Sequence, residues 1–136
     1  MSMSNTTEND FVGYTFNATA ISWDGATNLY VAAHTADPGE AGNQSTSEAT
    51  HTSYARVTVA RSAGGWTVSG NQASNAALIQ FPQCTGGSNT LTYVSVGTAA
   101  SGTGQILFSG ALTSSLSVSS GIQPQFAINA LTVSMD

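Results

Sequence analysis

The side chains that could do chemistry in this chain are few and lie far apart in the sequence. His34, Asp37, His51 and Cys84 are of the types that serve as nucleophiles, bases or metal ligands. A Ser/His/Asp hydrolase could be assembled from them and one of the many serines. However, the chain has no Gly-x-Ser-x-Gly turn and no cysteine-protease signature around Cys84. We therefore expect a protein that is not an enzyme, with no catalytic residues.

The same four side chains do not have the spacing of a metal site. Metal ligands mostly come as close pairs, and a single cysteine excludes a four-cysteine zinc site. The segment 97–104 has the glycines of a phosphate loop but no lysine at the required place, so a tight β-turn is the better interpretation. The sequence thus predicts neither a metal nor a cofactor.

The charge of the chain excludes several kinds of partner. Charged residues make up 7% of its 136 residues, whereas about 25% is average for soluble domains. There is no lysine, Arg56 and Arg61 are the two strong cations, and the formal net charge is -5. Phosphate neutralisation needs many cations, so we expect no nucleic acid and no anionic membrane as partner. Residues 1–10 also lack the basic and apolar regions of a secretory signal, so export by that route is not indicated.

The elements that position these residues begin with a strand expected over Asn28–Thr35. Its run Leu29–Ala33 is apolar on both sides, which is typical of a strand buried on both faces in a sandwich core. Asp37-Pro38-Gly39 stops it, because proline has no N–H for a ladder and glycine tolerates positive φ. A long loop is expected over residues 36–52, and the next strand, Tyr54–Arg61, alternates with Arg56 on its wet face.

The remainder of the chain has the spacing of an all-β fold. Turns are expected at Gly64-Gly65, as a hairpin, and at Gly70-Asn71, and Gly110 is a candidate bulge. Further strands are expected at residues 66–69, 72–81, 91–98, 105–112, 116–119 and 126–135. About eight strands at such spacings predict an antiparallel jelly roll or β-sandwich in one domain, residues 1–136.

The N-terminal arm, about residues 1–27, is less regular. Residues 1–9 are polar and expected to be flexible, and Asn9 or Asp10 could cap a short helix that runs towards residue 22. The alternation of residues 14–20 favours a strand instead, and of the two we prefer the helix.

The arm is rich in aromatic side chains: Phe11, Tyr14, Phe16 and Trp23. Packing on the arm's own domain is the default interpretation. The sharper hypothesis is that these residues form an interface with a neighbouring molecule, since aromatics are enriched in interface cores.

Four stretches carry a family resemblance. They are Leu-Tyr-Val-Ala-Ala-His-Thr-Ala-Asp-Pro-Gly-Glu-Ala-Gly-Asn (29–43), the two strands of 54–71, Val-Gly-Thr-Ala-Ala-Ser-Gly-Thr-Gly with its continuation (96–113), and Pro-Gln-Phe-Ala (124–127). Together they resemble a widespread family of small structural proteins of tailed phages, known as capsid cement or decoration proteins and often labelled tail-fibre-like. The resemblance covers roughly residues 28–136.

The resemblance implies a jelly-roll virion protein without enzymatic activity. Such a protein would be made in the bacterial cytoplasm, bind the major capsid protein on the outer surface of an icosahedral head, and bridge neighbouring capsomers as a homodimer. The alternative is a tail-fibre or receptor- and glycan-binding module, which would use the loop at 36–52 and the aromatic side chains as its binding face.

Overall fold

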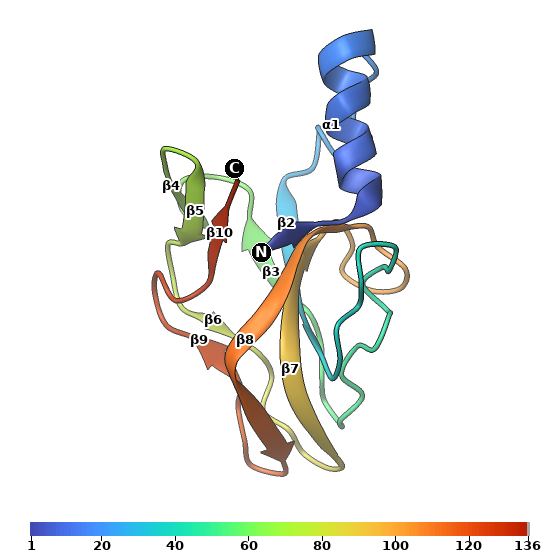
Figure 1. Cartoon of the computed structure of the whole chain (residues 1–136). Coiled ribbons are helices and arrows are strands. Elements are labelled where there is room, and N and C mark those ends of the chain that lie inside the picture. The colour runs from blue at the N-terminus through green and yellow to red at the C-terminus, as the bar shows by residue number, and fades with distance from the viewer. Residues whose placement is uncertain (136) are drawn as a thin grey trace.

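The structure, a computed structural model, describes residues 1–135 and is mostly β (Figure 1). Its elements, in chain order, are β1 (Ser2–Met3), α1 (Asn5–Asn17), β2 (Asn28–His34), β3 (Val57–Ala60), β4 (Trp66–Ser69), β5 (Gln72–Asn75), β6 (Ile79–Gln80), β7 (Ser88–Gly97), β8 (Ile106–Ser119), β9 (Gln125–Phe126) and β10 (Thr132–Ser134).

The strands form three antiparallel sheets. The largest has the order β1-β8-β7-β2-β3, the second β10-β5-β4, and the third β6-β9. Between the sheets lies an apolar core that includes Val31, Phe81, Leu91 and Val96. The predicted antiparallel jelly roll or β-sandwich with a short N-terminal helix is confirmed.

Strand β2 is buried on both faces, as its apolar run predicted. Its residues Val31 to His34 are all buried, and β3 and β7 pair with its two edges in the largest sheet. Val31 and Ala33 belong to the apolar core. The loop after β2 returns alongside it, where the N–H of Ala49 donates to the carbonyl of Ala33 at 2.9 Å. This loop is therefore held against the sheet.

The predicted start of the helix, and the flexibility of residues 1–9, are wrong. Helix α1 begins at Asn5, and its N-cap Ser4 accepts a hydrogen bond from the N–H of Thr7 at 3.2 Å. The hydroxyls of Ser4 and Thr7 also donate to the carbonyl of Ile106, and β1 pairs with β8. Tertiary contacts thus order a stretch that its polarity marked as flexible, and the strand alternative for residues 14–20 is also wrong.

The boundaries of several strands also differ from prediction. The turn at Gly64-Gly65 makes no hairpin, since β3 and β4 belong to different sheets. The strand predicted at 72–81 is two strands, β5 and β6, that pair with different partners. Its length fits one strand, but the chain crosses between sheets within it.

Strand β8 runs without interruption through residues 113–115. These polar residues were predicted to separate two strands, at 105–112 and 116–119. The register with β7 shifts twice, between Leu91 and Tyr93 and between Val96 and Gly97, and neither shift is at Gly110, which pairs directly with Val94. Gly110 instead gives room to the N-terminus, because a Cβ there would lie 2.9 Å from Cγ of Met1.

Candidate interaction surface

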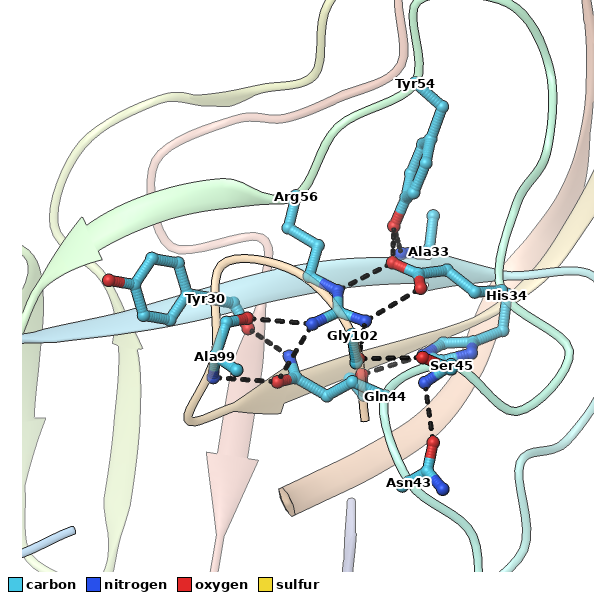
Figure 2. A network of polar contacts seen from close by, with 12 residues as sticks. Tyr30, Ala33, His34, Asn43, Gln44, Ser45, Tyr54, Arg56, Ala99 and Gly102 are labelled. Carbon is cyan, nitrogen blue, oxygen red and sulfur yellow. Dashed lines mark hydrogen bonds and ion pairs between the residues drawn. The ribbon is translucent and has the colours of Figure 1, made fainter. Parts of the chain in front are cut away.

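Arg56 lies in a buried polar network rather than on a wet face, which corrects the prediction (Figure 2). Its Nε and Nη2 donate to the two carboxylate oxygens of Glu48 at 2.7 and 2.8 Å. Its Nη1 and Nη2 also donate to the carbonyls of Ala99 and Gly102, at 2.9 and 2.6 Å. The face is dry because Glu48, from the loop after β2, and the turn after β7 cover it.

Gln44 completes this network and is itself fully buried. Its Nε2 donates to the carbonyl of Tyr30 at 3.2 Å, and its Oε1 accepts the N–H of Ala99 at 3.0 Å. A Cβ at Gly97 or Gly104 would lie 2.2 Å from a Gln44 side-chain atom, so both glycines are needed for this packing. The carbonyls of Ala99 and Gly102, in the turn 97–104, thus accept hydrogen bonds from Arg56, and the turn has a structural role.

His34 sits beside this network and is also fully buried. Its Nδ1 lies 2.9 Å from the carbonyl of Thr46, and its Nε2 lies 2.7 Å from Oγ of Ser95. Burial lowers the pKa of His34 below its ordinary value of 6.5. The ring is therefore neutral at pH 7, with Nδ1–H donating to the carbonyl and Nε2 accepting the Ser95 hydroxyl. Both nitrogens are thus occupied by partners within the protein.

The other three candidates for chemistry are each held by their own neighbours. Asp37 is exposed, and its Oδ1 accepts the N–H of Gly39 at 2.8 Å. His51 is buried, with Nδ1 3.0 Å from Oδ1 of Asn89. Cys84 is buried, and its thiol contacts the carbonyl of Gly86 at 3.2 Å. Over residues 1–135, no group of three His, Cys, Asp or Glu side chains is placed to hold a metal ion.

Two of the four predicted interface aromatics pack on each other within the arm. The rings of Phe11 and Trp23 lie 6.0 Å apart at 76°. The indole Nε1 of Trp23 donates to Oδ2 of Asp10 at 3.1 Å, and the guanidinium of Arg61 lies 5.5 Å from the centre of the Trp23 ring. These contacts tie α1 to the segment that leads into β2. That they also touch another molecule stays a prediction.

The other two, Tyr14 and Phe16, are exposed on a helix that stands away from the sheets (Figure 1). Phe16 is 79% exposed, and only Thr7 of α1 is buried. Val12, which sequence reasoning missed, is 59% exposed. Its spacing of four residues from Phe16 was the available signal, because such residues are neighbours on a helix. Val12 and Phe16 are exposed on one side of α1 and Tyr14 on the other, and the contact of Tyr14 and Phe16 with a partner remains a prediction.

A second apolar surface, also missed, is a groove of about 500 Å³ between the two larger sheets. Leu29, Val96 and Phe108 line it from one sheet, and Trp66, Val68, Ala73 and Val133 from the other, with residues 61–63 completing the wall. Val68 is 72% exposed. The groove depends on how far the two sheets diverge, which strand patterns do not encode.

Comparison with known proteins places the chain in one family. Residues 2–134 match the family model described as podophage GP4 fiber I protein gp80, a match that includes the helical arm. No curated protein matches the chain. Among residues 1–135, no helix has the length and apolar character needed to cross a bilayer. Since the family model spans almost the entire sequence, the chain belongs to the family of the podophage GP4 fiber I protein gp80, a family of phage structural proteins.

Proposed function

We propose that this phage structural protein is a capsid cement protein, which binds the major capsid protein on the outside of the head. The observation that carries this proposal is the set of exposed apolar side chains on α1, with Val12 and Phe16 on one side of the helix and Tyr14 on the other. A helix fixed at its N-terminus that presents large apolar side chains to water is typical of a segment made for protein contact. The arm would thus join protein subunits on the shell, including two copies of the clamp, with Phe11 and Trp23 holding it in position.

The rest of the molecule suits a clamp that acts in many copies. Charged residues make up 7% of the chain, and two of them, Arg56 and Glu48, form an ion pair inside the protein. The surface is therefore dominated by uncharged polar groups. Such groups make hydrogen-bonded, hydrated contacts at low desolvation cost. A homodimer that bridges two capsomers gains from effective concentration, so each individual contact can be weak. Binding to the expanded shell would then stabilise that shell by linkage.

The second candidate is a subunit of a tail fibre or a receptor- and glycan-binding module. The family description favours it, because it names a fibre protein. In that case the exposed aromatic side chains of α1 would contact other fibre subunits or the ligand. The two candidates differ in where the protein lies on the particle and in how many copies are present.

The test is to purify particles, quantify this 13.8 kDa chain per genome, and locate its density by cryo-electron microscopy. A cement protein requires copies in proportion to the capsomers and density on the outer head surface. A handful of copies, with density at the tail, would overturn the cement proposal and support the fibre candidate.

A further inference from the structure

The molecule has two exposed apolar surfaces, one on α1 and one in the groove between the larger sheets. On α1, Glu8, Val12 and Phe16 follow one another at intervals of four residues and therefore form one row along the helix. All three are exposed. Thr7 and Phe11 lie on the opposite side, towards the rest of the protein. The row is convex and apolar, with a carboxylate at its N-terminal end.

The groove between the sheets is concave and apolar, with a cation in its wall. Of the two arginines in the chain, Arg56 is buried against Glu48, whereas Arg61 lines the groove and its side chain is 33% exposed. Nη1 of Arg61 donates to the carbonyls of Asp24 and Ala26. Its Nη2 has one weak contact, 4.0 Å from the exposed carboxylate of Asp24. The Trp23 ring lies 5.5 Å from this guanidinium and covers one of its faces, so a further carboxylate would have to approach Nη2 from the exposed side.

Helix α1 is not placed to fill the groove of its own chain. Ser4 and Thr7 bind it to the carbonyl of Ile106, and Trp23 binds it through Asp10. Figure 1 shows α1 and the sheet of β4, β5 and β10 at the same end of the molecule, on either side of its largest sheet. Within one copy, therefore, α1 leaves both its own row and the groove uncovered.

We infer that the occupant of the groove is α1 of a second copy of this chain. The row of each copy lies in the groove of the other about a twofold axis, so both contacts form at once. Val12 and Phe16 enter between the sheets, beside Val68, and Glu8 approaches Arg61 of the other copy. In this arrangement the carboxylate of Glu8 meets the cation of Arg61, and the apolar row meets the apolar groove. The inference rests on the homodimer of the proposed function and specifies its interface.

The first test is the oligomeric state of the full chain by sedimentation equilibrium. Phe16→Ser and Val68→Asp change exposed side chains, so the fold is retained, and each should raise the dimer dissociation constant by about tenfold or more. The control is Ile128→Ser, because Ile128 is also a large apolar residue, 59% exposed, and lies neither in the row nor in the lining of the groove. A wild-type chain that stays monomeric, or a dimer that both variants leave unchanged, would overturn the inference.

The second test traps the contact between two different chains. Val12→Cys and Val68→Cys proteins are mixed and oxidised, and a disulfide between them can form only across two copies. The native Cys84 is buried and should not compete. Val12→Cys should form the mixed disulfide with Val68→Cys much faster than Ile128→Cys does, and equal rates would show that the dimer is built elsewhere. Neither test depends on where the protein lies on the particle, so a correct dimer remains compatible with a failed cement proposal.

Discussion

Arg56 shows what a single residue contributes when it is both charged and buried. Its guanidinium is enclosed, and Glu48 opposite it is also largely covered. We expect Arg56→Met to lower the free energy of unfolding by about 3–5 kcal/mol, because it leaves an uncompensated carboxylate in a dry site. Urea denaturation measures the loss.

The matched control for this change is Arg61→Met, which removes the other arginine. Its contact with Asp24 is long and exposed, and exposed ion pairs contribute about 0–1 kcal/mol. Equal losses for the two variants would mean that the network around Arg56 does not stabilise the fold more than a surface pair does.

His34 should make the stability depend on pH. Burial holds its pKa below the ordinary value of 6.5, so on acidification the unfolded chain takes up the proton first. Stability is therefore full above about pH 6.5 and falls as the pH drops, by about 1.4 kcal/mol per pH unit, until the pKa of the folded state is passed. His34→Gln, which keeps a donor and an acceptor, should flatten the slope of the thermal midpoint between pH 7 and pH 5. An unchanged slope would assign the dependence to another group.

These two residues also show the limit of sequence reasoning at this scale. The alternation at residues 54–61 correctly separated Arg56 from Val57 and Val59, but it could not tell which face a distant loop covers. His34 lies near the end of the strand expected over Asn28–Thr35, a position that leaves its burial open. It is hydrogen-bonded but fully buried, since Thr46 and Ser95 reach it from elsewhere in the chain.

At the scale of elements, Gly97 ends β7 where the side chain of Gln44 crosses it. A Cβ at Gly97 would lie 2.2 Å from Cδ of Gln44, whereas nothing lies within 4 Å of a Cβ at Gly25. We expect Gly97→Ala to destabilise the protein by about 1–3 kcal/mol through overpacking. Gly25→Ala should be neutral or stabilising, because it reduces the entropy of the unfolded chain. Thermal unfolding of both variants is the measurement, and a Gly97→Ala protein as stable as the wild type would show that Gln44 can move aside.

Elements with strong local patterns were predictable, whereas those that depend on distant partners were not. The alternation at 91–98 predicted most of β7, and the apolar run predicted β2. The polar residues 113–115 in the middle of β8 lack an apolar pattern, and pairing of the residues on either side of them with β7 makes β8 continuous there. Ser4 is of a type that often caps helices, but so are several other residues of the arm. The contacts of Ser4 and Thr7 with Ile106, about a hundred residues away in sequence, fix the start of α1 there, and they have no local signal.

At the scale of the whole molecule, strand spacing and turn residues were sufficient to predict the sandwich. The candidate site was predictable only in part. The aromatic composition drew attention to the arm, but it did not separate Tyr14 and Phe16, which are exposed, from Phe11 and Trp23, which pack on each other. The groove was not predictable, because it arises from the angle between two complete sheets.

The composition leads to a prediction about how the protein is attached to the particle. The chain has two strong cations, and one of them, Arg56, is buried in an internal ion pair. Attachment therefore cannot rest on a basic patch. Its acidic residues could meet basic side chains of the capsid, but at 1 M salt the Debye length is about 3 Å, and exposed pairs lose most of their small contribution. Uncharged hydrogen bonds, apolar contacts and the avidity of a dimer remain.

Particles should therefore retain this protein in molar sodium chloride and lose it in denaturant, which weakens apolar and peptide contacts alike. The measurement is the 13.8 kDa band in pelleted particles after each wash. Particles without the protein should still have assembled heads that rupture more easily on heating. Release by salt alone, with heads intact, would mean that attachment is electrostatic. Heads that lose the protein but keep their full heat resistance would contradict a cement role, and the exposed arm would then have its partner in a fibre.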